Sequence, residues 1–240
     1  MGFFCNIEPD FMSMIKTVLR QEIFTINKNI TSLIHELQME MYEDDDNFED
    51  EEGKAEYDAQ FDALDIRLEQ PKQYNSIIDF SHDDIFTYTA TLSEKLVNLL
   101  RKLSIKELYI ISVLKMELLG AKKNNYIPLK ESVKRFEKLI NNSNHNEAFE
   151  LDLENLPQCI ETFFWLQRCD TSSPEYLFFI DKEDRFAFTI CRYGNLHTTE
   201  FETEILTEDI LNDTGWYFVN ERCYEKFSET NVIDGRKFDS

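Results

Sequence analysis

The chain has 240 residues, of which 42% are hydrophobic and 13% aromatic, so it has enough apolar material for a folded core. Its six glycines lie at least twenty residues apart, which excludes the glycine-rich phosphate loops of Rossmann and P-loop enzymes. With 47 acidic and 25 basic residues the formal charge is −22. We expect such a surface to repel nucleic acids and anionic membranes and to attract basic proteins.

The cysteines and the N-terminus indicate the compartment. Five cysteines, an odd number, show no C-x-x-C spacing. The N-terminus has neither the basic start nor the apolar length of a signal peptide. The longest strongly apolar run, from Leu108 to Leu114, has seven residues, whereas a membrane-spanning helix needs about 20. We therefore expect a cytoplasmic protein with reduced thiols and no membrane span.

Residues 11–41 predict one long amphipathic helix, because apolar side chains recur every three or four positions from Phe11 to Met41. Between Leu19 and Leu37 the spacing follows a heptad pattern for about two and a half repeats. Since a coiled coil usually needs about three or four heptads, we expect this seam to pack inside the chain as a helical hairpin. A homodimer through the helix 11–41 is the alternative.

The next segment carries most of the acidic bias, with ten acids among residues 43–58. Repulsion between these like charges disfavours a helix or a strand, so we expect a mobile acidic loop at 43–53. Apolar residues spaced four, three and four apart then predict a short helix over 57–68, which ends before Pro71.

Residues 83–119 predict two further helices. Ser104 and Glu107 form the pattern of a capping box for the second of them, and Gly120 is placed to end it. A short basic helix is expected over 129–140. Together these segments predict an N-terminal helical domain, a bundle of long amphipathic helices, over residues 1–146.

Beyond the polar run 141–146 the sequence pattern changes. An aromatic helix is expected over 158–168. Segments rich in aromatic and β-branched residues then predict antiparallel strands at 176–180, 185–192, 196–206 and 216–219. Residues 197–205 alternate as in an exposed edge strand. The fold class is therefore α+β, with a second domain over 147–240 that forms a small meander and one packed helix.

No catalytic or metal motif is complete in the sequence. His35 and Glu36 begin an H-E-x-x-H pattern, but Met39 stands where the second histidine is needed. His82 with Asp83 is explained more simply by acidic residues at a helix start. Cys191 and His197 flank an expected hairpin turn, yet two ligands without a second pair make a weak zinc site. We accordingly predict no metal, no cofactor and no enzymatic activity.

Charge is distributed unevenly along the chain. Residues 1–70 have a net charge of −13, residues 71–150 of +2 and residues 151–240 of −11. The basic residues of the middle block suggest an alternative, a regulatory nucleic-acid-binding protein with a helix-turn-helix over 122–138. The residues that would contact phosphates are Lys122, Lys123, Lys130, Lys134 and Arg135. An enzyme of unrecognised family would require His82, Asp83 or a thiol to converge in a pocket.

The leading hypothesis is a non-enzymatic interaction protein that binds and masks a basic partner, for example an immunity protein or inhibitor that blocks a toxin or nuclease. It rests on the dense, polarised acidic charge, which steers oppositely charged partners. The expected contacts in the acidic loop are Asp44, Asp45, Asp46, Asp50, Glu51 and Glu52. A second acidic patch is expected at Glu200, Glu202 and Glu204.

Overall fold

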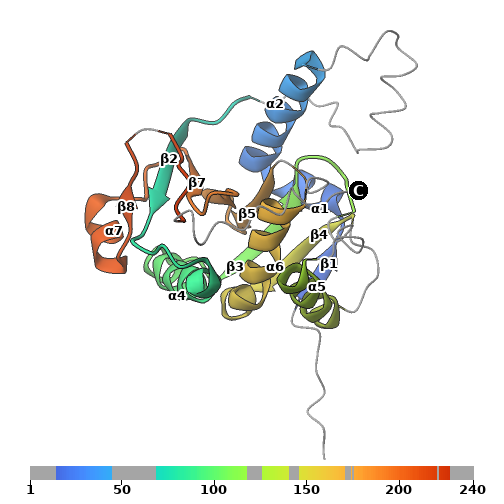
Figure 1. Ribbon diagram of the computed structural model, residues 1–240. Helices are drawn as coiled ribbons and strands as arrows, with labels where there is room; N and C mark the ends of the chain where they lie inside the picture. Colours follow the sequence, from blue (N-terminus) through green and yellow to red (C-terminus); the bar gives the residue numbers. More distant parts are fainter. Residues whose placement is uncertain are drawn as a thin grey trace, which may run out of the picture.

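The computed structural model of the protein describes residues 15–44, 69–117, 126–140, 146–170, 174, 176–220 and 222–227. Over these residues the chain forms six α-helices and an eight-stranded antiparallel sheet (Figure 1). The helices are α1 (Arg20–Ile26), α2 (Lys28–Asp44), α4 (Ile85–Lys102), α5 (Ile127–Leu139), α6 (Leu156–Cys169) and α7 (Glu208–Thr214). The strands are β1 (Ile15–Val18), β2 (Gln73–Asp79), β3 (Glu107–Ser112), β4 (Ala148–Asp152), β5 (Leu177–Asp181), β6 (Phe186–Ile190), β7 (Leu196–Phe201) and β8 (Tyr217–Phe218).

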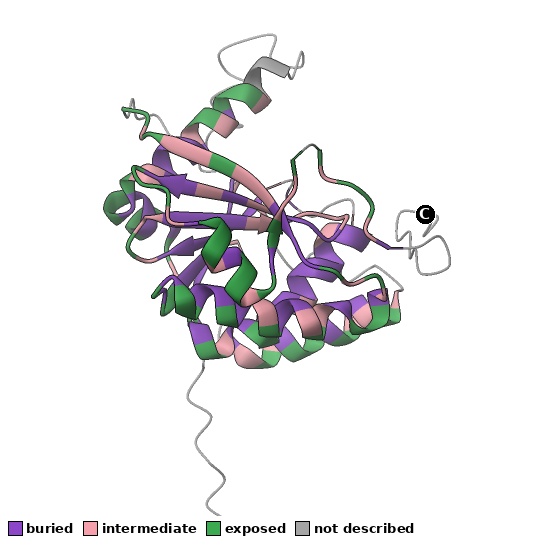
Figure 2. Ribbon diagram, turned by 90° about the vertical axis from the view of Figure 1, so that its left-hand side faces the viewer, coloured by how far each residue is buried: buried purple, intermediate pink, exposed green. Residues whose placement is uncertain are grey.

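The sheet lies between two layers of helices. Its strand order is β1-β4-β3-β5-β6-β7-β2-β8, and neighbouring strands pair antiparallel. Helices α4, α5 and α6 cover one face, and α1 and α2 lie against the other (Figure 1). Figure 2 shows most of the strands and the inward sides of the helices as buried, whereas much of β2 is intermediate or exposed.

Central strand β5 shows why the sheet needs both layers. All five of its residues are buried. Successive side chains of a strand point to opposite faces, so Leu177 and Phe179 join the core beneath α4, α5 and α6. Phe178 and Ile180 join the smaller core beneath α1 and α2. Because apolar side chains of β5 lie on both faces of the sheet, the strand needs a layer of helices on each side.

The α+β class is confirmed, but the predicted arrangement of an N-terminal bundle followed by a small meander is wrong. Strands β1, β2 and β3 come from the first half of the chain and lie in the same sheet as the later strands. β4, which begins at Ala148, pairs with both β1 and β3. The segments 1–146 and 147–240, expected as two domains, thus contribute strands to one sheet.

The prediction of a single helix over 11–41 is also wrong in its described part. Residues Ile15–Val18 form β1 at one edge of the sheet. Two helices follow, separated by Asn27, whose backbone is not helical. The buried Asn27 side chain donates from Nδ2 to the carbonyl of Lys182 at 3.1 Å. This tertiary contact, which the heptad spacing does not encode, accompanies the break.

The second helix expected within 83–119 is a strand instead. Ser104, the predicted helix cap, adopts a positive φ of 62°, and Glu107–Ser112 form β3 in the interior of the sheet. The β-branched and aromatic side chains of this segment are buried on both faces. Because that burial outweighs a local capping pattern, the strand forms in place of the helix.

Other predicted elements are confirmed. The first helix expected within 83–119 is α4, the helix expected over 129–140 is α5, and the helix expected over 158–168 is α6. The four C-terminal strands are also present as β5 to β8. The hairpin turn expected between Cys191 and His197 is present, and Gly194 within it has a positive φ of 88°. The edge assignment for residues 197–205 is wrong, because β7 lies between β6 and β2. The helix expected over 57–68 lies outside the described residues.

Among the described residues, none of the helices combines the length and the apolarity that crossing a bilayer requires.

Candidate metal centre and the adjoining cavity

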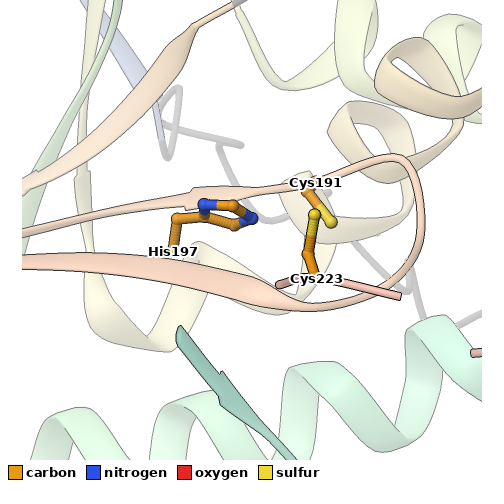
Figure 3. Close-up of side chains that lie close together, drawn as sticks. All are labelled: Cys191, His197 and Cys223. Carbon is orange, nitrogen blue, oxygen red and sulfur yellow. The ribbon is translucent and has the colours of Figure 1, made fainter. Parts of the chain in front are cut away.

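Three metal-ligating side chains meet beside the β6–β7 hairpin. Cys191 follows the last residue of β6, His197 is the second residue of β7, and Cys223 belongs to the C-terminal segment 222–227. The two Sγ atoms and one ring nitrogen all lie within 4.8 Å of one another. Figure 3 shows the imidazole directed toward both sulfur atoms.

The hairpin turn places the first two of these residues. The backbone N–H of Cys191 donates to the carbonyl of Asn195 at 2.9 Å, and the N–H of Gly194 donates to the carbonyl of Cys191 at 3.0 Å. The positive φ of Gly194 closes this turn, and a Cβ there would approach the Phe227 ring to 3.1 Å. The tight turn therefore brings Cys191 next to His197 on the adjacent strand.

The C-terminal segment contains Cys223, and contacts of the residues that follow Cys223 fix this segment in place. Tyr224 donates its backbone N–H to Asn195 Oδ1 at 2.9 Å, and Lys226 donates its own to the carbonyl of Tyr193 at 3.3 Å. Phe227 is 4% exposed and belongs to the main core. These contacts hold an irregular segment against the hairpin, so Cys223 occupies a defined position.

Burial favours the neutral forms of Cys191 and His197. Burial raises the pKa of Cys191 to about 11, and the neighbouring Cys223 adds to this effect. Burial lowers the pKa of His197. The Nε2 atom of His197 is shielded from solvent and has no hydrogen-bond partner among the described residues. A buried polar atom without a partner carries a cost that a bound ligand relieves.

This arrangement suits metal binding better than nucleophilic catalysis. A reactive cysteine needs a lowered pKa, whereas the pKa of Cys191 is raised. Two sulfur atoms and one imidazole nitrogen are a donor set that zinc prefers. Zinc bond lengths place tetrahedral ligand atoms about 3.5–3.8 Å apart.

A cavity of about 620 Å³ adjoins the trio. His197 forms part of its wall, together with residues of α2, β2 and β6 and the segment around Tyr176. The cavity lies on the face of the sheet that carries α1 and α2, since Phe178 of its lining belongs to that core. His197 is thus shared between the cavity and the cysteine pair.

A second hollow, of about 390 Å³, contains the polar residues that an enzyme would need. His82 and Asp83 line it together with Asp79, Tyr224 and Lys226. His82, however, is engaged by the start of α4, with Nε2 at 3.0 Å from Thr87 Oγ1. Neither Cys191 nor Cys223 is among the described residues that line this hollow. The Asp79–Lys226 ion pair in it is buried and fixes the C-terminal segment.

The acidic residues predicted to contact a partner lie in three different parts of the chain. Asp44 is the last residue of α2, so the expected loop 43–53 begins no earlier than residue 45. The other acids of that loop, Asp45, Asp46, Asp50, Glu51 and Glu52, lie outside the described residues. Glu202 and Glu204 are exposed in the turn after β7.

Glu200 differs from these two because it is only 2% exposed. Its Oε2 accepts the backbone N–H of Leu206 at 2.7 Å and that of Ile205. Burial raises the pKa of Glu200, and these two hydrogen bonds oppose the rise. Glu200 therefore holds the chain after β7 in place and is not available to a partner, which corrects its assignment to the second surface patch.

Only part of the predicted basic face lies within the described residues. Lys122 and Lys123 lie outside the described residues, while Lys130, Lys134 and Arg135 lie on α5. Arg135 forms an ion pair with Glu161 of α6 at 2.6 Å. The described element that follows α5 along the chain is the strand β4.

Sequence reasoning found two of the three clustered residues and missed the third. Cys191 and His197 are recognisable because both flank a predictable turn. Cys223 lies 26 residues after His197, in a segment without a regular element, and no spacing rule connects it to the hairpin. Comparisons of the chain with protein families, curated proteins and solved structures found no match.

Proposed function

We propose that the protein binds one zinc ion between Cys191, His197 and Cys223, and that the ion fastens the C-terminal segment to the β6–β7 hairpin. The observation that carries this proposal is the convergence of three ligand atoms within 4.8 Å. The solvent-shielded, unpartnered Nε2 of His197 supports it independently. This proposal replaces the sequence-based expectation that the chain holds no metal.

The ion would link parts of the chain that are far apart in sequence. His197 and Cys191 belong to the hairpin, and Cys223 belongs to the segment 222–227. Both thiols lose their protons when zinc binds, because the thiolate is the ligand. Three protein ligands leave the fourth tetrahedral position to water or to a bound molecule. The ion stabilises the folded chain in proportion to its affinity and concentration.

The test is metal titration of the purified, chelator-treated full chain. Cobalt(II) is added first, because its visible and near-ultraviolet bands report tetrahedral geometry and thiolate ligation, and zinc then displaces it. We expect one metal ion per chain. Cys191→Ala, His197→Ala and Cys223→Ala each lose affinity on the order of 100-fold or more.

The matched control is Cys159→Ala, since Cys159 is a buried cysteine on α6 outside the trio. This variant is expected to bind cobalt with unchanged stoichiometry and spectrum. Absence of stoichiometric uptake by the parent chain contradicts the proposal. Equal loss in the Cys159 variant also contradicts it, because the loss then reflects damage to the fold.

We propose as a second candidate function that the protein binds a basic partner through acidic surface groups, without enzymatic activity. The specific observation is that exposed Glu202 and Glu204 are followed by Glu208 and Asp209 in the exposed first turn of α7. Clustered charge of one sign accelerates association with an oppositely charged protein. Asp44 at the end of α2, together with Asp45, Asp46, Asp50, Glu51 and Glu52, remains the other set of predicted contacts.

Its test uses the tagged chain as bait in nuclease-treated host lysate at low and moderate salt. A retained basic protein is then measured for association rate against two charge-reversed variants. One variant combines Asp44→Lys, Asp45→Lys and Asp46→Lys, and the other combines Glu202→Lys and Glu204→Lys. Both variants are expected to associate more slowly and with a weaker salt dependence. An unchanged association rate in both variants refutes this candidate.

A further inference from the structure

The cavity of about 620 Å³ beside His197 is lined by both apolar and polar side chains. Helix α2 contributes the apolar Leu33 and Leu37. The strands contribute apolar side chains such as Phe178 and polar ones such as Asn75 and Thr199. The volume falls within the range of pockets that hold small organic ligands, about 300–1,000 Å³.

No Asp, Glu, Lys or Arg is among the described residues that line the cavity. This absence is informative because 30% of the chain is charged and the formal charge is −22. A charged ligand would lose its hydration in the cavity without gaining a counter-ion there, which is costly. The lining therefore selects for a neutral occupant.

The polar side chains that the strands contribute to the lining include a hydrogen-bonded pair. The hydroxyl of Thr199 donates to Asn75 Oδ1 at 2.8 Å. This bond orients the Asn75 amide between two neighbouring strands, β2 and β7. Thr189 of β6 lies opposite His197 in the strand register and also lines the cavity. Hydroxyl and amide groups of this kind recognise hydroxyl or amide groups of a ligand.

We propose that this cavity binds a neutral small molecule that has an apolar body and a hydroxyl or amide group along one side. The apolar body packs against α2, and the polar group faces the strands. The cavity and the metal centre share His197, but the proposal does not depend on the metal. It is therefore tested on the metal-free chain first and on the zinc-loaded chain second.

The experiment uses the neutral fluorescent dye Nile red as the probe. Its three competitors have a ten-carbon chain in common and differ in the charge of the headgroup. We expect saturable, one-to-one dye binding to the full chain. Decanol is expected to displace the dye at a concentration at least about tenfold lower than decanoate or decyltrimethylammonium, because each ion would be buried without a partner. Preference for the cation would show that surface charge governs binding, and it overturns the proposal.

Thr189→Trp fills the cavity and is expected to abolish dye binding. Because this variant has an added ring on an interior strand, Leu37→Trp on the half-exposed part of α2 serves as the second blocking variant. The matched control is Thr91→Trp on α4, which lies beneath the opposite face of the sheet. Thermal unfolding of each variant confirms that it is folded.

Dye binding that persists in both blocking variants assigns the dye to another surface and overturns the proposal. Failure of the parent chain to bind the dye also overturns it. The oligomeric state is measured by sedimentation at the same chain concentrations. If dye binding decreases as the chain forms dimers, a second copy occupies the cavity, and this contradicts the proposal. A metal-free chain that binds the dye but no cobalt separates this inference from the metal proposal.

Discussion

The buried ion pair between Asp79 and Lys226 offers a quantitative test of how the C-terminal segment is held. The Asp79 side chain is 1% exposed and that of Lys226 is 3% exposed. Lys226 Nζ donates to Asp79 Oδ1 and, at 2.5 Å, to the carbonyl of Phe80. Burial lowers the pKa of Lys226 although Asp79 opposes that change. The pair is therefore a candidate for a double-mutant cycle.

Removal of one partner from a buried ion pair costs about 3–5 kcal/mol. In Lys226→Met the Asp79 carboxylate keeps the hydroxyls of Tyr224 at 2.7 Å and Tyr217 at 3.2 Å, so we expect about 3 kcal/mol. In Asp79→Asn the ammonium keeps the Phe80 carbonyl and the Phe80 ring at 3.8 Å, so we expect about 4 kcal/mol. The double variant buries no unpaired charge and is expected to lose about 4 kcal/mol, a coupling of about 3 kcal/mol.

The assay is guanidinium unfolding of the four chains in the metal-free state, followed by cobalt titration. Lys226→Met is also expected to weaken cobalt binding about tenfold, because Cys223 lies on the same tethered segment. The control is Lys102→Met, which removes the exposed ion pair with Asp213 and is expected to cost less than about 1 kcal/mol. Additive losses in the double variant, within about 0.5 kcal/mol, would refute the assignment of a coupled pair.

Three further predictions concern other parts of the molecule. Burial raises the pKa of Asp184, which accepts two backbone N–H groups at the start of α2, to about 6. The folded chain thus holds this proton more tightly than the unfolded chain, and stability relative to Asp184→Asn should fall by about 2 kcal/mol as pH rises from about 4 to 7, measured by urea unfolding. Thr207→Ala removes the side chain that accepts the N–H of Ile210 at 3.3 Å and should lower the unfolding free energy by about 1 kcal/mol. Hydrogen peroxide should join Cys191 and Cys223 of the metal-free chain in a disulfide, with a loss of two hydrogens by mass spectrometry and protection by zinc.

The outcomes that contradict these three predictions are distinct. A pH-independent stability difference between the parent chain and Asp184→Asn means that the carboxyl titrates normally in the folded state. No loss of stability in Thr207→Ala means that water replaces the cap without cost. A peroxide-treated chain whose disulfide involves Cys159 or Cys169 means that the hairpin and the C-terminal segment separate readily.

The sequence alone determined the elements whose signals are local. Helix α4 begins where Asp84 accepts the N–H of Phe86, and α5 and α6 have proline in their first turn. The hairpin turn at Gly194 needs a positive φ that glycine adopts without strain. In each case the residues that determine the conformation lie within a few positions of one another, so the sequence is sufficient.

Tertiary structure alone decided the short and central strands. Strands β1, β2 and β4 have four to seven residues, and a short strand is stable only beside its partners. Strand β3 and the break at Asn27 likewise depend on burial and on a contact with Lys182. Local patterns could not supply these partners, because they come from segments far away in the chain.

The candidate site divides in the same way. The sequence places Cys191 and His197 on either side of a turn and so predicts that they are neighbours. Cys223 joins them because Tyr224, Lys226 and the buried Phe227 fix an irregular segment against that turn. A ligand supplied through long-range contacts has no signature in local spacing, and only the folded chain determined that the pair becomes a trio.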